Sequence, residues 1–192
     1  MGCFPITAPI NSCGAINANF DFESDALIGN WDDIASYSRD SVNPTLINAL
    51  TLKLFSAGVT PSQMFKIYFR ETSPMATLAE TTEEKSYAKP SKVEGELVIY
   101  ERTPASALIK QQLDNNKIFL ILKQASKKGT SAYYVILGLE SGLKPMAGEN
   151  FVGDKGGYVF KFTASNLTYP QEFLWNIDSA TTEAIITALQ VQ

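Results

Sequence analysis

Short runs in which apolar and polar residues alternate are the feature that most limits what this chain can fold into. "INALTLKLFSAG" (47–58) places Leu50, Leu52 and Leu54 on one face and polar side chains on the other. "PSQMFKIYFRE" (61–71) repeats the pattern. The two runs predict half-buried strands that form a hairpin around "AGVTP".

Four more runs predict strands, at 93–101, 117–124, 132–140 and 157–165. The segment "ASKKGTS" joins the second and third of them, and its Gly129 suits a hairpin turn. Short strands separated by turn residues are typical of a β-sandwich or a β-barrel.

Two segments carry helical signals instead. In "RTPASALIKQQLDNN", Thr103 is a good N-cap and Pro104 suits the first helical position. The segment predicts an amphipathic helix over 103–115, packed on a sheet through one mostly apolar stripe. The stripe consists of Ala105, Leu108, Ile109, Gln112 and Leu113.

The tail "DSATTEAIITALQVQ" predicts a second, C-terminal helix. Asp178 or Ser179 can cap it, and Ala184, Ile185 and Leu189 give it an apolar side. The chain is therefore expected to be mainly β with a flanking helix, an α+β fold built on a sandwich or barrel.

The 192 residues favour one domain with extensions. We expect an N-terminal arm over 1–40, a β domain over 41–176 and a C-terminal helix or extension over 177–192. The arm is acidic, with no Lys or Arg before Arg39. Because it also carries large apolar residues, it is interpreted as a segment that packs against another surface.

The segment 72–92 interrupts the rhythm of the β domain. It has no hydrophobic period, contains two prolines and mixes charges of both signs, which predicts a long irregular loop. Three interpretations are open: a mobile surface loop, an arm that orders on a neighbouring subunit, or a lid over a ligand.

Residue types limit the chemistry. The chain has no histidine, which excludes Ser-His-Asp and Cys-His catalysis and most zinc enzymes. The cysteines, Cys3 and Cys13, are interpreted as free thiols, with a disulfide as the alternative. The adjacent acids at 32–33 and 83–84 are interpreted as solvated. We therefore expect no enzyme, no cofactor and no metal site.

The glycine-rich stretch "GENFVGDKGGYVFKF" (148–162) is the one that could be mistaken for a phosphate-binding loop. Gly148 and Gly153 have the right spacing, but Asp154 stands where the lysine is needed, and a strand follows instead of a helix. The structural interpretation is favoured: a turn before a strand. The predicted turn positions are Gly138, Gly142, Gly153, Asp154 and Gly157.

Charge and composition limit the partners. The net charge is −4 and no basic patch stands out, which argues against sequence-specific recognition of nucleic acid. No uninterrupted apolar run approaches the roughly 18 residues of a membrane span, so we expect no membrane partner. Charged residues make up only 19%, which suits a protein whose surface is partly buried by neighbours.

The runs "AYYVILGLESGLKP", "GDKGGYVFKF" and "YPQEFLW" resemble the C-terminal half of phage tail-tube and tail-ring (neck) proteins, especially those of crAss-like and other phages of Bacteroidetes. "NWDDIASY" and "EGELVIYERTPASALIKQQLDNNKIFLILK" resemble the start and the strand–helix–strand middle of the same proteins. The likeness spans most of 10–175 as spaced features. The loop at 72–92 and the C-terminal extension depart from it.

This resemblance implies a tail-tube-like sandwich and a non-enzymatic virion protein, assembled in the host cytoplasm. About six or twelve copies would form a ring between adjacent tail or neck proteins, through which DNA passes without specific binding during genome ejection. A negative lumen would repel phosphate and let the duplex slide. Candidate assembly residues are Asp21, Phe22, Trp31, Asp33, Glu80, Glu83, Glu84 and Lys85.

The alternative is a monomeric module that binds a glycan or a peptide through exposed aromatic residues. Its candidates are Trp31, Tyr133, Tyr134 and Trp175. Core packing explains large aromatic residues more often than ligand contact does.

Overall fold

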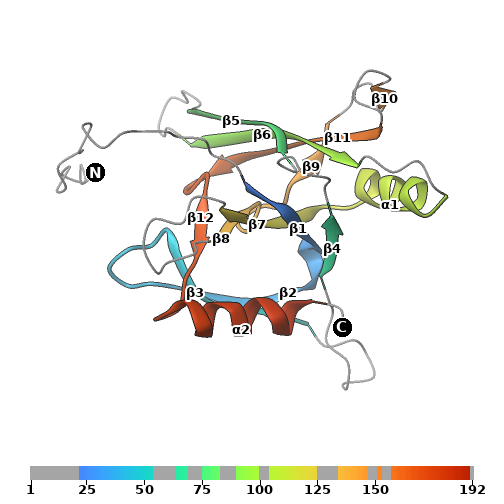
Figure 1. Cartoon of the computed structure of the whole chain (residues 1–192). Helices are drawn as coiled ribbons and strands as arrows, with labels where there is room; N and C mark the ends of the chain where they lie inside the picture. The colour runs from blue at the N-terminus through green and yellow to red at the C-terminus, as the bar shows by residue number, and fades with distance from the viewer. Residues whose placement is uncertain are drawn as a thin grey trace, which may run out of the picture.

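A computed structural model of the chain shows two β-sheets stacked face to face and two helices (Figure 1). The predicted mainly β, α+β fold is confirmed. The structure describes residues 22–53, 64–68, 75–82, 90–99, 104–124, 134–146, 151–152 and 157–190.

The larger sheet has seven strands in the order β2-β3-β12-β8-β7-β1-β4. Its neighbours are antiparallel except β12 and β3, which run parallel. The strands are β1 (Phe22–Asn30), β2 (Ile34–Arg39), β3 (Leu46–Leu52), β4 (Phe65–Tyr68), β7 (Ile118–Gln124), β8 (Tyr134–Leu137) and β12 (Glu172–Leu174).

The smaller sheet has the strand order β10-β11-β6-β5, and β9 also pairs with β11. Its strands are β5 (Met75–Thr82), β6 (Ser91–Ile99), β9 (Lys144–Pro145), β10 (Phe151–Val152) and β11 (Gly157–Leu167). The strands predicted at 93–101, 117–124, 132–140 and 157–165 correspond to β6, β7, β8 and β11. The predicted hairpin of β7 and β8 is confirmed.

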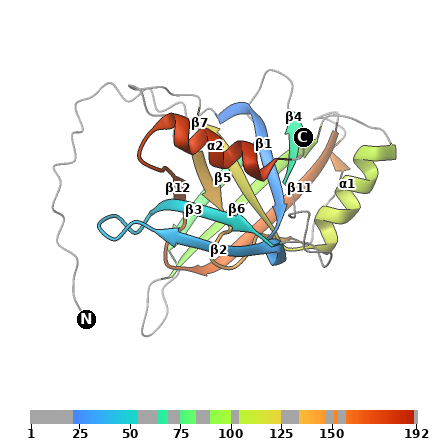
Figure 2. The same cartoon turned by 90° about the horizontal axis from the view of Figure 1, so that it is seen from below.

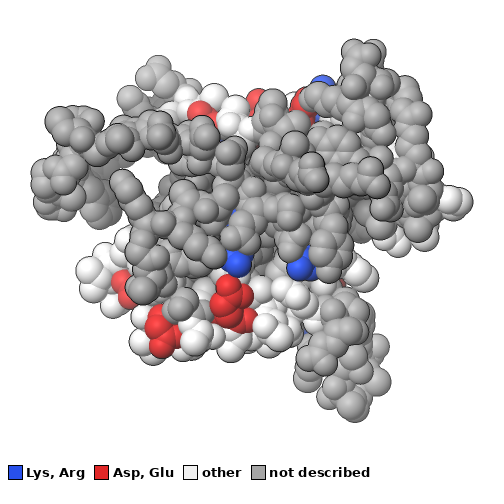
Figure 3. All heavy atoms as spheres, in the orientation of Figure 1, with Lys and Arg blue, Asp and Glu red and all other residues white. Residues whose placement is uncertain are grey.

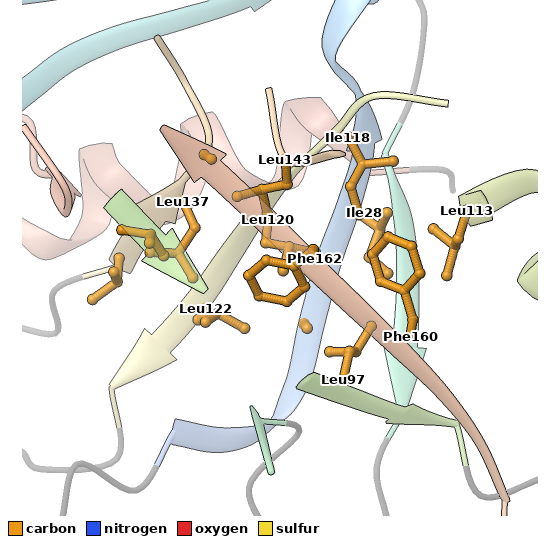
Figure 4. Packing of buried hydrophobic residues seen from close by; sticks show 14 of the residues in the cluster. Ile28, Leu97, Leu113, Ile118, Leu120, Leu122, Leu137, Leu143, Phe160 and Phe162 are labelled. Carbon is orange, nitrogen blue, oxygen red and sulfur yellow. The ribbon is translucent and has the colours of Figure 1, made fainter. Parts of the chain in front are cut away.

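The central strands of the larger sheet are buried on both faces, which gives the molecule two cores. Along β7, Leu120 and Leu122 enter the core between the sheets, and Phe119 and Ile121 enter the core on the opposite face. A strand covered on both sides needs a continuous apolar run, and "IFLIL" supplies one. Phe160 and Phe162 of β11 fill the core between the sheets (Figure 4).

The second core lies under α2 (Ser179–Leu189), which packs across the larger sheet (Figures 1 and 2). Ile186 and Leu189 of this helix are buried there. The predicted C-terminal helix and its cap are confirmed: the Asp178 carboxylate accepts a hydrogen bond from the Thr181 N–H at 2.7 Å. That bond also lowers the pKa of Asp178.

The helix α1 (Pro104–Asn115) confirms the prediction at 103–115, and it packs against β11 and β9. Its expected apolar stripe is partly wrong. Leu113 is buried, but Leu108 is 55% exposed, and Lys110 is buried in its place. The Lys110 stem covers apolar surface while its ammonium reaches the Asp114 carboxylate one turn on.

The arm expected over 1–40 is wrong for residues 22–39. These residues form β1, the short 3₁₀ helix η1 (Trp31–Asp33) and β2, and β1 pairs with β7 on one side and β4 on the other. The apolar trio Ala26, Leu27 and Ile28 is buried, so the segment packs within its own domain. Residues 1–21 lie outside the described part of the chain.

The loop expected over 72–92 is wrong for 75–82, which forms β5 and pairs with β6 in register Leu78↔Gly95. β5 is an edge strand, and its successive residues Ala79 and Glu80 are both exposed. Because neither face of the strand is fully buried there, its sequence does not need to alternate. Residues 83–89 lie outside the described part.

The hairpin expected from 47–58 and 61–71 is also wrong. The two strands form as β3 and β4, but β3 pairs with β2 and β12, and β4 pairs with β1. Local alternation predicts strands but not their partners, which are set by contacts between distant segments. No helix among the described residues is long and apolar enough to cross a membrane.

Candidate functional site

Trp31 lies between the end of β1 and the start of β2, and two hydrogen bonds hold it in place. Its backbone N–H donates to the Lys117 carbonyl at 3.0 Å, and its indole Nε1–H donates to the Leu139 carbonyl at 2.9 Å. The Asn30 side chain accepts from the Asp32 N–H at 3.2 Å and so caps η1. The indole is therefore held in one orientation.

The turn that follows β8 closes against this indole. Gly138 and Gly142 have φ of +83° and +72°, a region that favours glycine, and the Gly142 N–H donates to the Gly138 carbonyl at 2.9 Å. A Cβ on Gly142 would lie 3.0 Å from Trp31 Cγ. The turn predicted at these glycines is present, and the second glycine allows its close approach to Trp31.

Trp31 lines two hollows. The first, of about 440 Å³, lies along β2 and is lined by Trp31, Asp32, Ile34, Ala35, Ser36, Tyr37, Lys53, Leu139 and Glu140. The second, of about 370 Å³, lies between the turn and β11 and is lined by Trp31, Lys117, Ser141, Gly142, Lys144, Thr163, Ala164, Ser165 and Asn166.

Beside the first hollow, an ionic cluster ties three parts of the chain together. Arg39 of β2 contacts the Glu172 carboxylate of β12 and, at 3.3 Å, the Glu140 carboxylate of the turn. Its guanidinium also donates to the Pro44 carbonyl at 2.9 Å and lies 4.8 Å from the ring centroid of Tyr169.

Glu172 is the most deeply buried member of this cluster, with 2% of its side chain exposed. Burial raises its pKa to about 7 although Arg39 acts in the opposite direction. Its Oε1 lies against the guanidinium without a hydrogen bond of good geometry. The cluster holds a carboxyl that can take up a proton near neutral pH, but this carboxyl is buried and does not reach an open surface.

The candidate assembly residues do not meet in one place. Trp31 and Asp33 lie in η1 at the end of the larger sheet, Phe22 begins β1 opposite Gln124, and Glu80 is exposed on β5 of the smaller sheet. Asp21, Glu83, Glu84 and Lys85 lie outside the described residues. Of the predicted turn positions, Gly157 begins β11 opposite Val152, and Gly153 and Asp154 lie outside as well.

The aromatic residues of the alternative interpretation are also separated. Tyr134 is only 5% exposed and belongs to the core under α2, so its role as an exposed ligand contact is wrong. Trp175 is half-buried and Trp31 lines the hollows, while Tyr133 lies outside the described part.

Sequence reasoning missed Arg39, Glu140, Glu172, Lys117 and Lys144. They are far apart along the chain, and no spacing links them before the strands are paired. On the face shown in Figure 3, acidic groups lie over the part of the molecule where Figure 1 places α2 and β3, with basic groups beside them. The ion pair of Lys123 and Glu183, at 3.7 Å, joins β7 to α2.

Within the described residues, no group of three potential ligands is arranged to hold a metal ion. No protein-family model, curated protein or solved structure matches the chain. The resemblance to phage tail proteins therefore stays a prediction.

Proposed function

We propose that the chain is a non-enzymatic structural protein of a phage virion, in the tail or neck, and that its copies form a ring around a DNA conduit. The observation that carries this proposal is the open larger sheet. Its outermost strands, β2 and β4, each have one edge with no described strand beside it. Open edges are templates for pairing with another chain.

The exposed and mostly small side chains of β2 suit a contact with another subunit. Four consecutive residues, 35–38, are exposed, and three of them are small. Figure 2 shows β2 along the outside of the molecule. Small side chains on an edge strand let a second backbone approach, and β2 carries no lysine or proline that would block pairing.

The edge at β4 carries Phe65, which is 67% exposed, and the neighbouring Lys66 is also exposed. The end of α2 contacts the residue before this strand, where the Met64 N–H donates to the Leu189 carbonyl at 2.7 Å. A large exposed apolar side chain on an edge strand suits a subunit contact.

The two edges differ, so a contact between β2 of one copy and β4 of the next is head-to-tail. Such a contact closes into a ring when the rotation per copy divides a full turn. We propose that the sheet continues from subunit to subunit in this way. The acidic net charge of −4 supports a conduit that does not retain DNA.

The test is negative-stain electron microscopy of the purified protein over a range of concentrations, with sedimentation velocity to give the mass. We expect rings with a central hole wide enough for duplex DNA. Ser38→Lys on β2 and Phe65→Lys on β4 should each abolish them, because a lysine on an edge opposes pairing.

Matched controls place the same lysine away from the edges. The controls are Val42→Lys and Leu108→Lys. Val42 is 90% exposed in the turn between β2 and β3, and Leu108 is 55% exposed on α1. Equal loss of rings in the controls would contradict edge pairing. A wild type that stays monomeric at every concentration would contradict self-assembly and favour the binding module.

A further inference from the structure

The second hollow contains a row of side chains set by strand register. Lys144 lies opposite Thr163 on β11. On its other side, Ile118 and Leu143 exchange both backbone hydrogen bonds, at 3.1 and 2.7 Å, which sets Lys117 opposite Lys144 at the next position. Residues directly opposite each other point to the same face, so Thr163, Lys144 and Lys117 lie side by side.

This row brings two like charges together. Like charges directly opposite each other destabilise a sheet. No carboxylate occurs among the described residues that line the hollow. Lys117 lies over the Trp31 ring, 4.9 Å from its centroid, and forms no ion pair in the described part of the chain; neither does Lys144.

Three described carboxylates on neighbouring elements are engaged in contacts of their own. Glu94, opposite Thr163 on β6, pairs with Lys92 at 2.6 Å. Glu96 pairs with Lys161 at 3.1 Å. Glu140, on the same turn as Ser141, holds Arg39 and accepts from the Thr168 N–H at 2.7 Å.

The hollow also offers hydroxyl groups. Ser141 and Ser165 line it, and the Thr163 Oγ1 is buried without a hydrogen-bond partner. A buried hydroxyl left without a partner costs free energy, and most such groups in folded proteins have one. Two ammonium groups and three hydroxyl groups around one hollow are donors that suit an anion with several oxygens.

We propose that this hollow binds a small phosphomonoester, with the phosphate between Lys117 and Lys144. A phosphomonoester carries a charge of about −1.5 to −2 at pH 7, which matches two lysines, whereas a carboxylate or a phosphodiester carries only one negative charge. The volume of about 370 Å³ falls in the range of small-molecule sites, so it has room for an organic group beside Trp31. This site lies within one copy of the chain and does not depend on ring assembly.

The experiment is isothermal titration calorimetry of the full chain with phenyl phosphate, benzenesulfonate and inorganic phosphate. Benzenesulfonate keeps the ring and the tetrahedral group but carries a single charge. We expect saturable binding of phenyl phosphate, weaker binding of inorganic phosphate, and at least about tenfold weaker binding of benzenesulfonate, because charge-assisted hydrogen bonds each contribute strongly.

Lys117→Gln and Lys144→Gln should each weaken phenyl phosphate binding about tenfold or more. The matched control is Lys161→Gln, which removes the same charge from the same face of β11, two residues from Thr163, and should leave the affinity unchanged. Circular dichroism of each variant checks that the fold is retained.

Several outcomes would overturn the proposal. They are no saturable binding at millimolar phenyl phosphate, equal loss of affinity in Lys161→Gln, and equal affinity for benzenesulfonate. Equal affinity for inorganic phosphate would keep the anion site and overturn the role of Trp31 in holding an ester.

Discussion

Two groups of charged side chains flank the turn after β8, and they differ in burial, in sign and in whether opposite charges are in contact. Around Arg39, the charges are of both signs and in direct contact, with Glu172 buried and Arg39 and Glu140 partly exposed. Around Lys144, charges are exposed, of one sign and without a carboxylate among the described lining residues. The first arrangement connects strands, and the second is what a site for an anion requires.

The difference shows where a charge contributes to the fold and where it is available for binding. A buried charge without a partner is far more costly than an exposed one, so Arg39, Glu140 and Glu172 must stay together. An exposed lysine pair costs little, because water screens the repulsion. Variants that remove one charge from either group test this difference directly.

Replacing Arg39 with Met should have the largest effect. It leaves Glu172 buried without a counter-charge and removes the donor to the Pro44 carbonyl. Breaking a buried ion pair by removing one partner costs about 3–5 kcal/mol. Urea unfolding at pH 8, followed by circular dichroism, measures it.

The control for this variant is Lys92→Met, which breaks the partly exposed pair with Glu94. It should change the free energy of unfolding by less than about 1 kcal/mol. Similar losses in the two variants would show that the Arg39 cluster is no different from a surface ion pair.

The second prediction is a pH dependence from Glu172. Its pKa is raised from 4.5 to about 7, so the folded protein holds a proton that the unfolded chain has released. Its contribution to stability is full below about pH 4.5 and is lost as the pH rises through 7. From pH 5 to pH 8 the free energy of unfolding should fall by about 2 kcal/mol.

Glu172→Gln should flatten this profile, because the amide does not titrate. The lowered pKa values of Asp40 and Asp178 act in the opposite sense, with stability lost as the pH falls through them, and they lie below this window. Parallel profiles for wild type and variant between pH 5 and pH 8 would refute the assignment to Glu172.

Much of the fold could be predicted from local patterns. The runs at 117–124 and 157–165 form β7 and β11, and the segments predicted to be helical at 103–115 and 178–192 contain the two helices. Strand formation and helix capping depend on residues that are close in the sequence, so local patterns are enough to predict them. β5 was missed because an edge strand exposes Ala79 and Glu80 and needs no alternation.

The candidate site could not be predicted because it depends on pairing between distant segments. Lys117 and Lys144 meet only once Ile118 is bonded to Leu143, and Arg39 reaches Glu172 only because β12 adds to β3 in parallel. Trp31 was selected as an assembly residue in an acidic segment and, in the alternative interpretation, as an exposed aromatic contact. Neither argument located the hollows that it lines.

The third prediction concerns Trp31, which lines both hollows. Trp31→Phe removes the hydrogen bond to the Leu139 carbonyl and part of the surface under Lys117. We expect a loss of about 1 kcal/mol, the net value of one hydrogen bond. Thermal unfolding checks it, with Trp175→Phe as the control that changes the other tryptophan.

The smallest effect should come from Lys144→Gln, and it should have the opposite sign. Removing one of two like charges that face each other should raise the free energy of unfolding by a few tenths of a kcal/mol in low salt. High salt should abolish this gain, because screening already weakens the repulsion in the wild type.

A double-mutant cycle with Lys117→Gln separates this repulsion from other effects of the substitution. If the two lysines repel each other, either substitution alone relieves the repulsion, and the second adds nothing. Additive gains in the cycle would mean that the lysines do not interact, which would remove the physical reason for placing a dianion between them. Lys144 is therefore expected to lower the stability of the sheet slightly in the free protein. A bound anion would offset the repulsion between Lys144 and Lys117.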